Sequence, residues 1–360
     1  MIFTPTERPD LHLASWWEPE ERDWVRCVLC PRYCSLPEGS RGFCYLRQNV
    51  KGRLITHAHG MAIGLCVDPI EKKPLYHFYP GSSILSFGTL GCNLGCKFCQ
   101  NWHMSKVAEQ PHERPTYTPG NLVQLALDKD CTGIAYTYNE PIIFGEWVRE
   151  VAREARAAGL KNVLVTNGYI TPQAREAVFE NIDAANVDLK AITSVFYRQL
   201  TLSHLEPVLD TLRWLAQQKD VWLEITNLLI PGENDTEQEI QELTQFIRRE
   251  LSPRIPLHFS AFHPDFKLQH HPATSLNTLV KAYHIARDSG LEFVYLGNVF
   301  TEVGQNTICP HCEQVLIHRL GWQVEMNSRF AGVCPSCKNE LPGQFGHERH
   351  PSHKLMRGLS

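Results

Sequence analysis

Short apolar runs alternate with longer amphipathic segments along most of the chain, from residue 84 to residue 296. The short runs are rich in β-branched and aromatic residues, which is typical of buried strands. They predict strands at residues 84–88, 133–137, 162–166, 185–189, 221–229, 257–260 and 293–296. Because a helical segment separates most consecutive strands, the pattern indicates βα units that form a parallel sheet.

The amphipathic segments have the spacing of helices that cover a sheet. In one of them, Phe144, Trp147, Val148 and Val151 recur at helical intervals, and Gly159 follows as a stop signal. Further helices are expected at residues 122–127, from 172 onward, at 207–217, from 235 onward and at 276–289. Each would lay its apolar face on the sheet and its charged face in water.

Six βα units and a closing strand are fewer than the eight units of a closed TIM barrel. The sequence therefore predicts an α/β fold, a partial (β/α)6 TIM-like barrel, over residues 81–300. Residues 1–80 hold many Pro, Gly and Arg residues and predict a Cys-rich metal-binding extension. Residues 301–360 change composition again and predict a zinc-ribbon-like module and tail, with strands at 314–319 and 322–326.

The composition disfavours several classes of protein. The 360-residue chain has a formal net charge of -4, so it lacks the general basic surface of a nucleic-acid-binding protein. No run of eighteen apolar residues and no basic-then-apolar leader occurs, so we expect a cytoplasmic protein without a membrane segment. The 13 cysteines fall mainly in groups with metal-ligand spacing, which favours a reducing compartment over disulfides.

The loop after the first predicted strand carries the most specific motif. Cys92, Cys96 and Cys99 have C-x3-C-x2-C spacing, and Phe98 precedes the third cysteine. Three thiolates on one loop can hold a 4Fe-4S cluster and leave its fourth iron open to another ligand. The alternative is a zinc site whose fourth ligand lies far away in the sequence.

Two groups of four cysteines lie near the ends of the chain. Cys27, Cys30, Cys34 and Cys44 form the first group, in a region too rich in loops to build its own core. Zinc and an auxiliary iron-sulfur cluster both suit four thiolates, and the spacing does not separate them, although we slightly favour zinc.

The second group consists of two C-x2-C knuckles. It is formed by Cys309, Cys312, Cys334 and Cys337. Two such knuckles supply the four soft ligands of a tetrahedral structural zinc site. An auxiliary iron-sulfur cluster is the alternative here.

Polar residues follow the ends of the predicted strands. Because the carboxyl ends of parallel strands meet at one rim of a barrel, these side chains are expected to face one ligand site. They are Asn139, Glu140, Asn167, Asp188, Lys190, Thr226, Asn227 and His263. Asp188 and Lys190 stand two positions apart, so both point to one face. Taken alone, that pair could be an ordinary surface ion pair. Because polar residues follow several neighbouring strands in the same way, the pattern as a whole favours a ligand-binding site.

Several motifs together carry a family resemblance. They are the cysteine group beginning at Cys27 and residues 68–77, 91–102, 137–141, 166–168, 188–190, 222–224 and 297–298. The cysteine loop resembles the signature of radical SAM enzymes, which use S-adenosylmethionine (SAM). The whole series is similar to AmmeMemoRadiSam-system radical SAM enzymes, which are relatives of pyruvate formate-lyase-activating enzymes.

The resemblance implies cofactors and roles. Cys92, Cys96 and Cys99 would hold a 4Fe-4S cluster with Phe98 beside it, and the rim residues would bind SAM. Reductive cleavage of SAM would give a 5'-deoxyadenosyl radical that takes hydrogen from an unidentified substrate, with proteins among the candidates. The implied partners are an electron donor such as flavodoxin or ferredoxin, and Memo-like or AMMECR1-like proteins.

Three other functions stay open. One is activation of a glycyl-radical enzyme, although this chain has Glu224 where activases carry Arg on the fifth strand, and it lacks the cysteine insert of some activases. Another is radical SAM modification of RNA, which the pI near 6.5 disfavours. The last is a zinc-ribbon interaction scaffold with a structural or redox cluster, which would form no 5'-deoxyadenosine.

Overall fold

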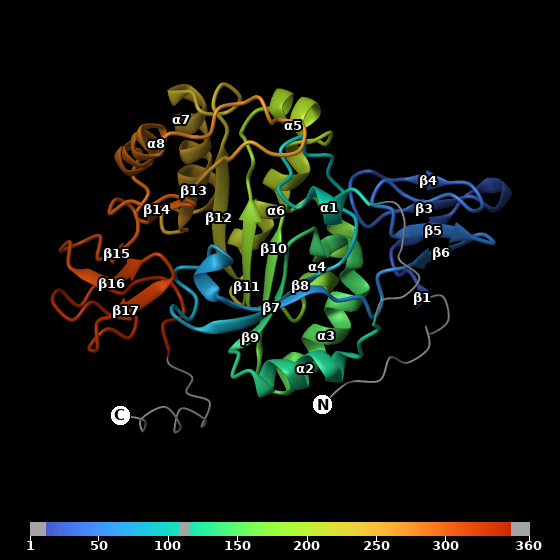
Figure 1. Cartoon of the computed structure of the whole chain (residues 1–360), viewed down its shortest axis with the longest axis horizontal. Helices are drawn as coiled ribbons and strands as arrows, with labels where there is room; N and C mark the ends of the chain where they lie inside the picture. Colours follow the sequence, from blue (N-terminus) through green and yellow to red (C-terminus); the bar gives the residue numbers. More distant parts are fainter. Residues whose placement is uncertain (1–11, 108–114, 347–360) are drawn as a thin grey trace.

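The computed structural model describes residues 12–107 and 115–346. Its centre is an eight-stranded sheet with the order β14-β13-β12-β11-β10-β9-β8-β7 (Figure 1). The strands are β7 (Ile63–Pro69), β8 (Ser83–Gly88), β9 (Gly133–Tyr136), β10 (Lys161–Thr166), β11 (Ala184–Asp188), β12 (Trp222–Leu229), β13 (Leu257–Ala261) and β14 (Val294–Gly297). β8 to β14 run parallel, while β7 pairs antiparallel with β8.

The seven predicted barrel strands are confirmed, with ends that shift by one residue or so. Strands such as β9, in which every residue is buried, are apolar throughout because the sheet is covered on both faces. The strand order ends at β14 on one side and at β7 on the other, so the sheet is open. The α/β fold with a parallel sheet is therefore confirmed.

Helices connect the parallel strands. They are α1 (Trp102–Ser105), α2 (Pro119–Asp128), α3 (Gly145–Ala157), α4 (Pro172–Phe179), α5 (Ser194–Leu200), α6 (Glu206–Ala216), α7 (Glu237–Phe246) and α8 (Leu276–Asp288). The α2 helix begins with a capping box between Thr118 and Asn121, followed by Pro119 in the first turn. Among the described helices, none combines the length and the apolarity needed to cross a membrane.

The N-terminal region folds into two small sheets beside the barrel, at the right of Figure 1. Their strands are β1 (His12–Leu13), β2 (Trp17–Pro19), β3 (Val25–Cys27), β4 (Ser35–Leu36), β5 (Arg47–Val50) and β6 (Arg53–Thr56). The sequence did not predict β7, which belongs to the predicted N-terminal extension but extends the barrel sheet. Asp68 on β7 binds the buried Lys73 ammonium at 2.7 Å and the Tyr138 hydroxyl at 2.8 Å, which fixes this edge.

The C-terminal module contains β15 (Thr307–Ile308), β16 (Val315–Leu320) and β17 (Gln323–Met326), at the left of Figure 1. It shares a hydrophobic cluster with Tyr76, Phe293 and Tyr295, which lie near the amino ends of the barrel strands. The buried Arg319 reinforces this contact by donating to the Tyr76 carbonyl at 2.8 Å. The module therefore packs on the base of the barrel.

Glu224 lies at the same base, near the start of β12. Its carboxylate accepts hydrogen bonds from the backbone N-H groups of Tyr76 and His77, at 3.0 and 2.7 Å, and lies 2.6 Å from the His258 ring. Glu224 therefore anchors the segment that precedes β8, at the opposite end of the strands from the three-cysteine loop.

Candidate functional site

The three-cysteine loop leaves the carboxyl end of β8, at the rim of the barrel. Cys96 is buried, while Cys92 and Cys99 are half-buried. Among the described residues, these three sulfurs do not all lie within 4.8 Å of one another. A four-iron cluster can bridge sulfurs that are spaced more widely than the ligands of a single ion.

Asn139 holds the start of this loop. Its side-chain oxygen accepts from the Thr89 backbone N-H at 3.0 Å, and its amide nitrogen donates to the carbonyls of Leu90 and Gly91 at 3.1 and 2.9 Å. Asn101 fixes the other end by donating to the Tyr138 carbonyl at 2.7 Å. Since the Asn139 amide is fully used by the loop, its structural role is to position the cysteines.

Asn167, after β10, reaches the loop directly. Its side-chain nitrogen donates to the Asn93 side chain at 2.8 Å and lies 4.0 Å from the Cys92 sulfur. Asn93 in turn donates to the Tyr169 carbonyl at 2.8 Å. This buried pair of amide side chains links the middle of the cysteine loop to the end of β10.

Glu140, after β9, is buried beside Asn167. One carboxylate oxygen accepts from the Thr166 hydroxyl at 2.6 Å and from the Ile142 N-H at 3.0 Å, and the other accepts from the Asn167 N-H at 2.8 Å. Burial raises the pKa of Glu140 to about 7, although these hydrogen bonds oppose the shift. The second oxygen can accept one more hydrogen bond, so Glu140 can bind a cationic group.

Asp188 and Lys190, at the end of β11, form an ion pair of 2.9 Å. The Lys190 side chain is only 15% exposed and lies 5.8 Å from the centre of the Phe98 ring, so the pair is not an ordinary surface bridge. Burial alone would lower the pKa of Lys190, but Asp188 and Cys96 together raise it, so the lysine stays charged. Phe98 is buried against Phe196.

The remaining predicted rim residues lie in other settings. Thr226 donates to the Asn186 side chain at 2.9 Å, and Asn227 donates to the Leu189 carbonyl at 2.7 Å. Both are buried and brace β11. His263 follows β13 and is exposed. The structure therefore gathers Glu140, Asn167, Asp188 and Lys190 near the loop, whereas Thr226 and Asn227 hold β11 and the residue that follows it.

Two cations near the cysteines were missed at the sequence level. Lys106 donates to the Leu94 carbonyl, and Arg32 donates to the Asn93 carbonyl. Burial raises the pKa of the Cys96 thiol to about 11, while Lys190 and Lys106 lower it. These lysines would favour the thiolates that iron requires. Arg32 lies within the N-terminal cysteine motif, but only the folded chain brings Arg32 and Lys106 to the three-cysteine loop.

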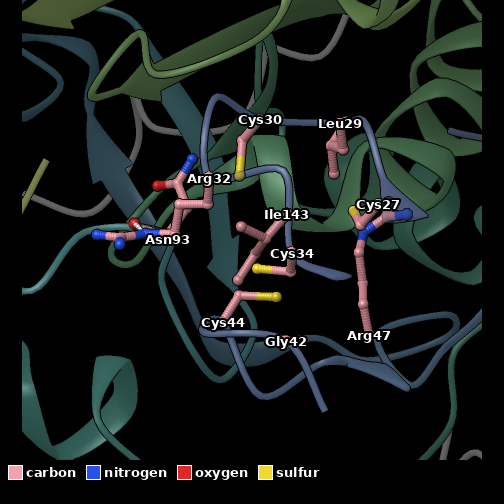
Figure 2. Close-up of a pocket in the computed structure, with 10 residues that line it drawn as sticks. All are labelled: Cys27, Leu29, Cys30, Arg32, Cys34, Gly42, Cys44, Arg47, Asn93 and Ile143. Atoms are coloured by element: carbon pink, nitrogen blue, oxygen red, sulfur yellow. Dashed lines mark hydrogen bonds between the residues drawn. The ribbon is translucent and has the colours of Figure 1, made fainter. Parts of the chain in front are cut away.

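The two cysteine quartets differ in geometry. In the C-terminal module, the four sulfurs of Cys309, Cys312, Cys334 and Cys337 all lie within 4.8 Å of one another, with two pairs at 3.5 Å. That arrangement suits one tetrahedral ion. The N-terminal quartet instead lines a pocket of its own (Figure 2).

The residues of this site lie in the part of the chain that matches a known protein family. The model of the family described as "Radical SAM superfamily" matches residues 87–247. The "Uncharacterized protein MJ0808" of Methanocaldococcus jannaschii is 42% identical over 306 residues, which cover 85% of this chain and 91% of that protein. The pyruvate formate-lyase 1-activating enzyme of Escherichia coli is 25% identical over 179 residues, which cover 47% of this chain and 70% of that enzyme.

Among solved structures, a radical SAM methyltransferase from Sphaerobacter thermophilus has a TM-score of 0.47 at 18% identity. The match covers 62% of this chain and 68% of that one. The family model spans the cysteine loop and the strands that carry Glu140, Asn167, Asp188 and Lys190. Residues 87–247 therefore match the radical SAM superfamily, and most of the chain is similar to protein MJ0808.

Proposed function

We propose that this protein is a radical SAM enzyme that binds a 4Fe-4S cluster on Cys92, Cys96 and Cys99 and SAM at the adjoining rim. When bound, the cluster would supply the electron that cleaves SAM to methionine and a 5'-deoxyadenosyl radical, which abstracts hydrogen from a substrate. The chain itself would orient SAM and exclude water. Glu140 would accept from the SAM amino group, and Asp188 and Lys190 would contact its other polar groups.

The cysteine inventory carries this proposal. Eight of the 13 cysteines belong to the two quartets, and three belong to the loop. The last two are Cys66, which is exposed on β7, and Cys131, which is buried. The loop is thus left with three thiolates, the number that leaves one iron open for SAM.

The proposal is tested by anaerobic reconstitution with iron and sulfide, followed by reduction with dithionite in the presence of SAM. We expect 5'-deoxyadenosine and methionine in equal amounts. A protein that carries a reducible cluster but forms no 5'-deoxyadenosine would instead support the scaffold interpretation.

Asp188→Ala is expected to weaken SAM binding about 10- to 100-fold, because a hydrogen bond to a charged group contributes about 1.5–3 kcal/mol. The cluster should stay intact, since Asp188 is not an iron ligand in this assignment. Calorimetric titration of SAM measures the affinity. Glu206→Ala, which removes an exposed ion pair on α6, is the control and should leave the affinity unchanged. Equal affinities of the two variants would remove Asp188 from the site.

SAM affinity is also expected to depend on pH through Glu140. Its pKa of about 7 means that the carboxylate is charged above pH 7 and neutral below it. Binding of the cationic amino group should therefore weaken about fivefold from pH 7 to pH 6, because the charged fraction of Glu140 falls from about one half to about one tenth. Titrations at several pH values test this. Glu140→Gln should bind SAM weakly at all of them, and a wild type without pH dependence would contradict the role.

Activation of a glycyl-radical enzyme is the second candidate, and the similarity to pyruvate formate-lyase 1-activating enzyme favours it. Incubation with such an enzyme, SAM and reductant should then produce a glycyl radical that is visible by EPR. If no radical forms while 5'-deoxyadenosine accumulates, the substrate is different. Memo-like or AMMECR1-like proteins are the next substrates or partners to test, with reduced flavodoxin or ferredoxin as the electron donor.

A further inference from the structure

The N-terminal quartet surrounds a pocket beside the barrel. Cys27 ends β3, Cys30 and Cys34 lie in the following loop, and Cys44 lies in the turn before β5. Figure 2 shows the sulfurs of Cys30, Cys34 and Cys44 directed toward a common space, which Ile143 of the barrel closes. Four thiols and an apolar wall are the composition of a metal-cofactor site.

The spread of these sulfurs distinguishes the type of cofactor. In the part of the chain that the structure describes, the N-terminal sulfurs do not gather within 4.8 Å of one another, whereas the C-terminal quartet does. Both quartets offer four thiolates, so ligand chemistry is the same and only the spacing differs. A wider ring of sulfurs leaves room for a cofactor with several metal atoms.

Arg47 gives an independent indication of an acceptor in this pocket. Its side chain is buried, and one terminal nitrogen donates to both oxygens of Glu146, at 2.9 and 2.6 Å. The other two guanidinium nitrogens are buried without a hydrogen-bond partner among the described residues. Buried donors are normally satisfied, and the sulfurs of an iron-sulfur cluster accept hydrogen bonds.

From this geometry we infer that Cys27, Cys30, Cys34 and Cys44 bind a second 4Fe-4S cluster, with Arg47 as a hydrogen-bond donor to its sulfurs. Four thiolates leave no iron open, so this cluster does not bind SAM. The inference rests on the proposed function only for the identity of the neighbouring cluster.

The second cluster would adjoin the SAM loop. Gly91, directly before Cys92, has a φ of 77°, and a Cβ built on it would lie 2.0 Å from the Cys44 carbonyl oxygen. Only glycine fits there, because any side chain would meet backbone. Arg32, which lines the pocket, also donates to the Asn93 carbonyl of the SAM loop. The two sites thus share a wall made of main chain.

Metal analysis of the full chain after anaerobic reconstitution tests the inference. Wild type should hold about eight iron atoms, the content of two 4Fe-4S clusters. Replacing Cys92, Cys96 and Cys99 by Ala should leave about four, in a cluster whose EPR signal does not respond to SAM. Cys66→Ser, which removes an exposed thiol outside all three groups, is the matched control and should keep the wild-type content.

The converse variant, Cys30→Ser/Cys34→Ser/Cys44→Ser, should keep only the SAM-responsive signal. If it does not fold, the variant in which Cys92, Cys96 and Cys99 are replaced by Ala still tests the inference. Zinc instead of iron in the N-terminal quartet of that variant, or no metal in it beyond one zinc ion, would overturn the inference. A wild type whose clusters do not respond to SAM would instead contradict the proposed function, so the two failures are distinguishable.

Discussion

Replacement of Cys92, Cys96 and Cys99 by Ala should abolish formation of 5'-deoxyadenosine. The three thiolates are the proposed ligands of the cluster, and the two cysteine quartets are assigned to metals of their own. Because reductive SAM cleavage depends entirely on that cluster, the loss should reach the detection limit rather than a fraction of the wild-type rate. Chromatographic assay of 5'-deoxyadenosine after reduction measures it.

This variant should remain folded. Its loop is held by hydrogen bonds from Asn139, Asn101 and Asn167, none of which uses a cysteine as its main partner. The far-UV circular dichroism and the zinc content should match those of Cys66→Ser. Retention of 5'-deoxyadenosine formation by a folded variant would show that the cluster lies elsewhere in the chain.

Removal of the C-terminal quartet is expected to damage folding instead of chemistry. We propose that Cys309, Cys312, Cys334 and Cys337 hold structural zinc, and loss of a structural metal is among the few changes that cost more than about 4 kcal/mol. Cys309→Ser/Cys334→Ser should lose zinc and expose the cluster of Tyr76, Phe293 and Tyr295 on which the module packs. Denaturant unfolding, followed with metal analysis, measures both effects.

The location of the C-terminal module separates its structural role from the chemistry of the three-cysteine loop. It packs at the amino ends of the barrel strands, whereas the three-cysteine loop lies at their carboxyl ends. Whatever fraction of the variant folds should therefore still carry a SAM-responsive cluster. Iron without zinc in the C-terminal quartet, or an unfolding free energy equal to that of Cys66→Ser, would contradict the assignment.

The barrel could be predicted from the sequence because its strands are covered on both faces. Burial on two faces requires apolar runs, as in β9 and β10, and such runs stand out against the amphipathic helices. The cysteine loop could be predicted for a similar reason, since metal ligands on one loop have a fixed local spacing. Both signals depend on neighbours in sequence.

Other features depend on contacts between distant residues. The β7 strand is mostly exposed or half-buried, and Gly64 and Pro69 interrupt its apolar residues, so its pairing with β8 is what identifies it as part of the sheet. Arginine side chains usually lie at the protein surface. Arg47 is nevertheless buried, because Glu146, 99 residues away, neutralises its charge. The position of Asn139 at a strand end predicts a cofactor contact, and the structure shows that its side chain also holds the backbone of the loop. Strand-end position alone does not separate residues that bind a ligand from residues that hold the binding loop.

The proposed function requires an open iron on the cluster held by Cys92, Cys96 and Cys99. Its most direct test is the EPR spectrum of the reduced protein with and without SAM, together with hyperfine coupling from SAM labelled with nitrogen-15 in the amino group. We predict that SAM changes the signal of one cluster and that the labelled nitrogen couples to it. An unchanged spectrum and no coupling, under conditions where calorimetry shows SAM to be bound, would contradict this assignment.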